Sequence, residues 1–301
     1  MDFINDVSGT SILWRYMDLS KFLDLLLHKH LIFPRYDKFE DTYEGYANNF
    51  AELARKSLCE TNEFDANHID YAIELLSDSV SIFNYYAYIS CWHLNDFESA
   101  GMWKLYCTSD DSLVIKTRVD TLKKSIQMKG KQKIVSSKVT YDYKLNGYSL
   151  KDIHGVHPNS ALLIKRESFE HEKEYRLILT DESLKSEREK SCEEILNFEF
   201  MSFDDWIKTN IKNGIDNKDQ ILTGYEYENN KYKKEFRENI LKTLKVNRPV
   251  VEAVTIIPEM LIEEIIISPH APKWFLTTVQ KLVGELGYKF KVSQSNLYDL
   301  K

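Results

Sequence analysis

Phe169-Glu170-His171-Glu172-Lys173-Glu174-Tyr175-Arg176 runs directly into the apolar segment Leu177-Ile178-Leu179. Interpreted as a β-strand, this stretch places Glu172, Glu174 and Arg176 on one face and apolar side chains on the other. Two carboxylates and a guanidinium cost free energy if they are buried without partners. On a solvated edge they cost little, and surface ion pairs also contribute little there. The stretch is therefore either a charged outer face or the floor of a polar cleft.

The composition bounds the class of protein. The chain has 301 residues, with 40 Lys and Arg against 47 Asp and Glu, a formal net charge of −7. An acidic balance argues against a general nucleic-acid binder or a membrane-surface binder, which need positive potential. The four cysteines show no CxxC spacing, which is typical of reduced thiols. The N-terminus lacks the features of a signal peptide, and no apolar run approaches about 20 residues. We expect a cytoplasmic protein without a membrane partner.

The hydrophobic periodicity predicts an α+β fold with a mixed, largely antiparallel central sheet flanked by helices. No linker divides the chain, so residues 1–301 are expected to form one domain with a helical cover at about 46–84. Residues 211–247 are polar and rich in chain breakers, and we expect a mobile excursion there. The predicted strands lie at 12–16, 31–33, 86–93, 112–116, 134–143, 161–165, 169–179, 195–200, 250–257, 263–269 and 288–292. The other predicted helices lie at 18–27, 98–106, 118–128 and 273–286.

Two further polar clusters occur in the sequence, one at Asp41 and Glu44 and one at His154 and His157. Asp41 and Glu44 lie three residues apart in the loop at 35–45. They could act together on a ligand, or they could cap the helix that follows. His154 and His157 share a Gly/Pro loop and could ligate zinc or iron, but no third ligand is near them in sequence.

Three landmarks occur in order along the chain: Trp14-Arg15-Tyr16 with the loop at 39–45, Ser90-Cys91-Trp92 with the helix at 102–106, and the stretch at 169–176. With Glu264-Ile265-Ile266-Ile267-Ser268-Pro269 after them, they resemble the bacterial domain-of-unknown-function family twenty-nine seventy-one over nearly the whole chain. That family has no settled activity. The resemblance makes a toxin or an anti-phage defence effector plausible.

More distantly, the layout is similar to the ADP-ribosyltransferase superfamily. Those enzymes place an Arg or His on a first strand, a Ser or Tyr on a middle strand and a Glu on a later strand. The matching residues here are Arg15, Ser90 and Glu174. Ser90 is followed by Cys91-Trp92, which departs from the Ser-Thr-Ser pattern, and the transferase model has no need of Arg176.

This resemblance implies NAD as the substrate and assigns roles to residues. Arg15 would contact the pyrophosphate, and Trp92 or Tyr16 would stack on nicotinamide. Glu174 would stabilise the oxocarbenium-like charge, and Glu172 would orient or deprotonate the attacking group. The predicted catalytic residues are thus Glu172, Glu174 and Arg176. The predicted substrate-binding residues are Arg15, Tyr16, Asp41, Glu44, Ser90 and Trp92.

Two other functions remain open from the residues alone. Asp41, Glu44, Glu172 and Glu174 could hold Mg²⁺ in a nuclease or nucleotide phosphohydrolase. The same charges could instead form an internal ion-pair network in a non-enzymatic sensor or partner-binding module. The partner expected in the enzymatic interpretations is a nucleotide-type small molecule, and a macromolecular target is left open.

Overall fold

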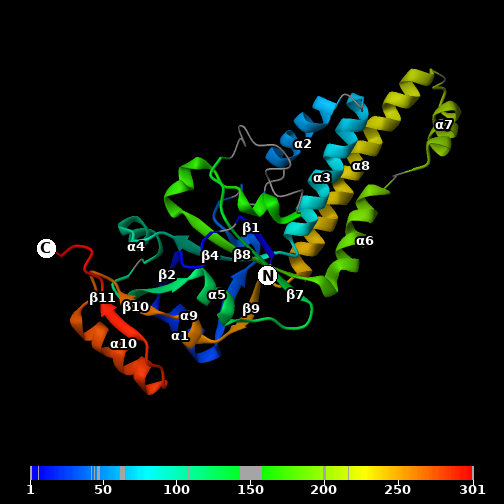
Figure 1. Cartoon of the computed structure of the whole chain (residues 1–301). Coiled ribbons are helices and arrows are strands. Elements are labelled where there is room, and N and C mark those ends of the chain that lie inside the picture. The colour runs from blue at the N-terminus through cyan, green and yellow to red at the C-terminus, as the bar shows by residue number, and fades with distance from the viewer. Residues whose placement is uncertain are drawn as a thin grey trace.

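A large mixed sheet organises the fold in the order β1-β7-β8-β4-β2-β5-β10-β11, and a small sheet has the order β3-β9-β6 (Figure 1). The structure, a computed structural model, describes residues 2–5, 7–41, 43, 45, 48–61, 65–107, 109–142, 158–198, 201–215 and 217–299. The large sheet is antiparallel except for the β1–β7 and β10–β11 pairs. Its strands are β1 Asp2–Asn5, β2 Ile12–Asp18, β4 Tyr88–Leu94, β5 Ser112–Arg118, β7 Gln132–Lys138, β8 Glu174–Asp181, β10 Glu264–Ile267 and β11 Lys291–Gln294. The expected α+β class is confirmed.

The main core lies on one face of this sheet. Alternate residues of β2, such as Leu13 and Met17, bury there together with Leu177 of β8. The small sheet and several helices cover that face. The small sheet comprises β3 His30–Pro34, β6 Ile126–Gln127 and β9 Val251–Ile256, and the covering helices are α1 Leu19–His28, α5 Val119–Ser125, α9 Pro258–Leu261 and α10 Lys273–Glu285. Asp18 caps α1 by accepting a hydrogen bond from the Lys21 N–H, as its position predicts.

Short elements pack on the opposite face. Helix α4 (Ala100–Tyr106) packs Met102 and Trp103 against Trp14 and Tyr16 of β2. The 3₁₀ segment η2 (Pro158–Leu163) packs against β4 and β8. The remaining 3₁₀ segments are η1 Tyr36–Lys38, η3 Glu167–Glu172 and η4 Glu182–Leu184.

A bundle of long helices extends away from the sheets (Figure 1). Helices α3, α6 and α8 run side by side in it, with α2 against α3 and α7 near the far end. The bounds are α2 Asn48–Thr61, α3 Ala66–Asn84, α6 Lys185–Leu196, α7 Phe203–Lys212 and α8 Lys218–Asn247. Helices α2 and α3 lie within 46–84, where the sequence predicts a helical cover.

Two predictions fail in this bundle. The expected strand at 195–200 begins inside helix α6, because Arg188, Cys192 and Ile195 recur at helical spacing and face neighbouring helices. The expected excursion at 211–247 is largely α8. Phe236, Ile240 and Leu244 pack beside Tyr86, so tertiary burial overrides the polar composition.

Two more predictions fail beside the sheet. The expected strand at 161–165 is instead mostly η2, whose apolar side chains are buried without alternation, and only Ile164 forms a bridge, to Thr140. The expected strand at 169–179 begins only at Glu174. Residues up to Glu172 form η3, and Lys173, with a φ of 41°, turns the chain into β8.

Candidate functional site

A cavity of about 350 Å³ lies where strands β2 and β4 separate. These strands pair only at Leu13–Leu94 and Trp14–His93. Beyond the last pair, β2 continues with β5 on its other side, and β4 continues with β8. The cavity lies between the facing edges of β2 and β4, with β3 as a further wall. A cavity of this volume is at the lower end of the range for small-molecule sites.

Arg15 supplies an available cation to the cavity wall. Its guanidinium donates hydrogen bonds to the Ser90 hydroxyl and, at 3.5 Å, to the Ile32 carbonyl. It also lies over the Trp92 ring, 5.3 Å from the centroid. No carboxylate among the described residues forms an ion pair with Arg15, and burial lowers the pKa of the guanidinium. A desolvated cation without a counter-charge favours an anionic ligand group.

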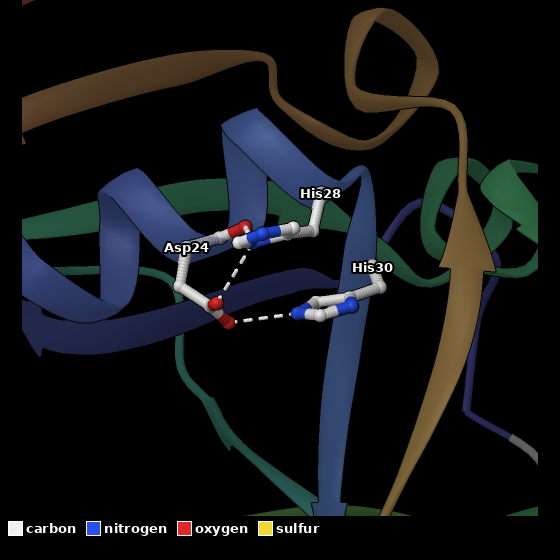
Figure 2. Close-up of side chains that lie close together, drawn as sticks. All are labelled: Asp24, His28 and His30. Carbon is white, nitrogen blue, oxygen red and sulfur yellow. Dashed lines mark hydrogen bonds and ion pairs between the residues drawn. The ribbon is translucent and has the colours of Figure 1, made fainter.

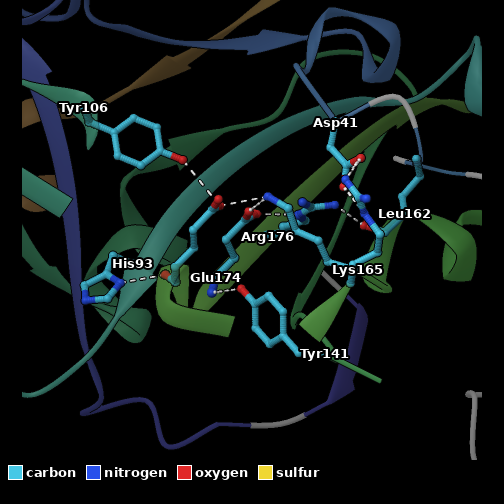
Figure 3. Close-up of polar contacts among 10 residues, drawn as sticks. Asp41, His93, Tyr106, Tyr141, Leu162, Lys165, Glu174 and Arg176 are labelled. Carbon is cyan, nitrogen blue, oxygen red and sulfur yellow. Dashed lines mark hydrogen bonds and ion pairs between the residues drawn. The ribbon is translucent and has the colours of Figure 1, made fainter. Parts of the chain in front are cut away.

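Across the cavity, Glu172 and Glu174 share one lysine. The Lys165 ammonium donates to Glu172 Oε2 and to Glu174 Oε1, each at 2.8 Å. Arg176 donates from Nε to Glu174 Oε2 at 2.6 Å and from Nη1 to the Leu162 carbonyl at 2.6 Å (Figure 3). All four charged side chains are buried, whereas only the two carboxylates line the cavity. The charged outer face considered from the sequence is therefore not what the structure shows.

The two carboxyls have opposite pKa shifts. Burial, followed by the neighbouring Glu174, raises the pKa of Glu172 to about 7. Burial also opposes ionisation of Glu174, but Arg176, Glu172 and Lys165 together hold its pKa well below the usual value. Glu172 is thus able to exchange a proton near neutral pH, while Glu174 stays ionised. With Glu172 protonated, Lys165, Arg176 and Glu174 carry a net positive charge, which also favours an anionic ligand.

The raised pKa of Glu172 predicts a pH dependence of stability. Between its ordinary value of 4.5 and about 7, the folded protein holds a proton that the unfolded chain has released. The stabilisation from this proton is fully present below about pH 4.5 and is lost as the pH rises to about 7. Urea unfolding at several pH values should show that Glu172→Gln flattens this part of the profile. Glu285→Gln, on the exposed side of α10, should leave the profile unchanged; equal slopes in Glu172→Gln and wild type would contradict the assignment.

Two more side chains, His93 and Tyr106, contact Glu172. The His93 ring donates from Nδ1 to the Glu172 carbonyl at 2.6 Å, and burial lowers the His93 pKa. Since the accepting atom is a carbonyl oxygen, Nδ1 carries the proton and a neutral ring has a free lone pair on Nε2. His93 Nε2 and Trp92 Nε1 are buried without a hydrogen-bond partner among the described residues. The Tyr106 hydroxyl donates to Glu172 Oε2 at 3.4 Å and lines the cavity (Figure 3).

Most of the predicted site residues meet here. Arg15, Tyr16, Trp92, Glu172 and Glu174 all line the cavity. Two others lie behind the wall. Ser90 accepts a hydrogen bond from Arg15, and Arg176 donates a hydrogen bond to Glu174.

The predicted acidic loop is placed differently. Asp41 accepts a hydrogen bond from Arg166 Nη2 at 2.8 Å, and it is not among the residues that line the cavity. Phe39, from the same loop, does line it. Glu44, His154 and His157 lie outside the described residues.

The sequence analysis missed Lys165, His93 and Tyr106 as site residues. Lys165 directly follows four apolar residues, and a lone cation at the end of a buried run is a signal that it pairs with buried acids. His93 directly follows Trp92 on a predicted strand. Its hydrogen bond is to the carbonyl of Glu172, which lies 79 residues further along the chain.

The chain matches no protein-family model, no curated protein and no solved structure. None of the helices that the structure describes is long and apolar enough to cross a membrane. The resemblances to the domain-of-unknown-function family and to the ADP-ribosyltransferase superfamily therefore remain expectations.

Proposed function

We propose that the protein cleaves the nicotinamide–ribose bond of NAD, as an ADP-ribosyltransferase-like or NAD-glycohydrolase-like enzyme. One observation carries the proposal. Arg15 on β2, Ser90 on β4 and Glu174 on β8 come from three neighbouring strands; Arg15 and Glu174 line one cavity, and Ser90 accepts a hydrogen bond from Arg15. These are the residues, in the strand order along the chain, that the distant resemblance to this superfamily assigns.

The charges of the site fit a dinucleotide. The Arg15 guanidinium has no carboxylate partner among the described residues and offers paired N–H donors for a pyrophosphate. The cavity is small, so it would take the nicotinamide–ribose half while the rest of the dinucleotide lies nearer its mouth. Phe39 and Tyr106 line the cavity and retain exposed ring surface for stacking. Trp92 already has Arg15 over its face.

The carboxylates fit the chemistry of bond cleavage. As the carbon–nitrogen bond breaks, its electron pair leaves with nicotinamide, and positive charge develops on the ribose. The ionised Glu174 stabilises that charge. Water or an acceptor side chain then forms a bond to the ribose carbon and releases its proton to Glu172. Because the pKa of Glu172 is about 7, that group accepts the proton at neutral and higher pH.

Replacing Arg15 by Gln is expected to weaken NAD binding about 10- to 100-fold, because a charge-assisted hydrogen bond contributes about 1.5–3 kcal/mol. Calorimetric titration measures the affinity, and chromatography of released nicotinamide measures turnover. Arg55→Gln on α2 removes an exposed Arg that pairs with Asp70, and it should change neither quantity. No NAD binding and no nicotinamide release by the wild-type protein would overturn the proposal.

The magnesium-dependent alternative has weaker support. Glu172 and Glu174 are already paired with Lys165 and Arg176, so a divalent cation would have to enter beside two buried cations. A non-enzymatic module would tolerate this ion-pair network, but it would not explain why Arg15 lacks a carboxylate partner in the part of the chain that the structure describes.

A further inference from the structure

A second set of ligand-type side chains lies at the edge of the cavity. Asp24 comes from α1, His28 is the last residue of that helix, and His30 is the first residue of β3 (Figure 2). No metal site is predicted from the sequence at these three residues.

Local chain geometry brings the three together. Asp24 and His28 are four residues apart on a helix and therefore share a face. Lys29 ends the helix with a φ of 52°, which turns the chain so that His30 returns beside His28. The two imidazole rings are stacked, with centroids 5.2 Å apart and an interplanar angle of 21°. Both rings thus present a nitrogen to one carboxylate.

The distances suit a metal ion. His28 Nδ1 lies 3.0 Å from Asp24 Oδ1, and His30 Nε2 lies 2.7 Å from Asp24 Oδ2. All three ligand atoms lie within 4.8 Å of one another. Ligands bound tetrahedrally at about 2.0–2.2 Å lie about 3.3 Å apart, so small side-chain rotations would form the site. Asp24 and His28 are exposed enough to make them, whereas His30 is held more firmly.

The location of the cluster beside the cavity is an independent argument that it binds a metal ion. Asp24 and His30 also line the cavity that contains Arg15. Two imidazoles and one carboxylate leave at least one coordination position open, as in catalytic zinc sites. At this place an open position is accessible to an anionic group in the cavity.

We propose that Asp24, His28 and His30 bind one divalent transition metal ion of the zinc type, with an open coordination position at the cavity mouth. The ligand set, nitrogen and carboxylate without thiolate, suits Zn²⁺ or Co²⁺ better than Mg²⁺ or Ca²⁺. This proposal does not depend on NAD chemistry.

The test titrates the full-length protein, stripped with EDTA and dialysed, with Zn²⁺ in a calorimeter and with Co²⁺ in a visible-absorption cell. We expect one saturable site per chain and a cobalt spectrum with the intensity of four- or five-coordinate geometry. Asp24→Asn and His28→Gln should each weaken binding about 100-fold or more. Both positions are exposed enough that the variants should fold, which circular dichroism checks.

His270→Gln is the matched control, because His270 is an exposed histidine outside the cluster. It should retain wild-type affinity. Absence of saturable binding by the wild-type protein would overturn the proposal. Equal losses in His270→Gln and His28→Gln would do the same, since they would indicate nonspecific surface binding.

Discussion

Glu174→Gln is expected to reduce nicotinamide release from NAD about 10³-fold, because the amide cannot stabilise positive charge on the ribose. Glu174 is the carboxyl that stays ionised, since Arg176, Glu172 and Lys165 hold its pKa well below the usual value. Its two oxygens already accept from Lys165 and Arg176, and Glu174 also lines the cavity in which the substrate would lie. Initial rates of nicotinamide formation at saturating NAD measure the effect.

The control must separate lost chemistry from lost folding. Glu170→Gln alters an exposed carboxyl on η3 that does not line the cavity, and it should retain full activity. Glu172→Gln removes a group that is about half neutral near pH 7, so the amide is a close substitute for its neutral form and the variant should fold well. In that variant the rise of activity with pH through about 7 should disappear. Full activity in folded Glu174→Gln would refute the assigned role.

A site residue could be predicted from the sequence where its neighbours in the chain determine its placement, and could not where distant segments determine it. Arg15, Trp92 and Glu174 stand on strands whose apolar alternation is visible in the sequence, so their placement could be predicted. Lys165 and His93 could not be assigned in this way. Their roles depend on the left-handed turn at Lys173, which ends η3 and directs Glu172 back toward the cavity. Nothing in the period-two pattern indicates that turn.

The elements of the fold likewise differ in whether their own sequence predicts them. The strands of the large sheet were mostly predicted, because each carries its own hydrophobic pattern. Helix α8 was not, since its polar composition conceals the few apolar residues, such as Ile240 and Leu244, that pack on α3 and α6. Such a helix gains its stability from tertiary contacts and not from local propensity.

Arg176→Met is expected to lower the free energy of unfolding by about 3–5 kcal/mol, because the buried Glu174 carboxylate loses one of its two cations and keeps only Lys165, which it shares with Glu172. The side chain of Arg176 is fully buried, and its loss removes a partner from both Glu174 and the Leu162 carbonyl. Methionine keeps most of the apolar volume, so the cavity term is small and the effect is mainly electrostatic. Urea unfolding followed by circular dichroism measures the change.

A double-mutant cycle shows whether the pair itself is the cause. If Glu174→Gln is combined with Arg176→Met, both members of this pair are removed while Lys165 and Glu172 remain, and the double variant should be more stable than the sum of the two single losses predicts. The exposed pair of Arg55 and Asp70 supplies the comparison, where Arg55→Met should cost no more than about 1 kcal/mol. A loss below about 1 kcal/mol in Arg176→Met, or strict additivity with Glu174→Gln, would show that this guanidinium does not hold the carboxylate in place. Arg15 would then be the guanidinium that matters to the site, and the low pKa of Glu174 would depend on Lys165.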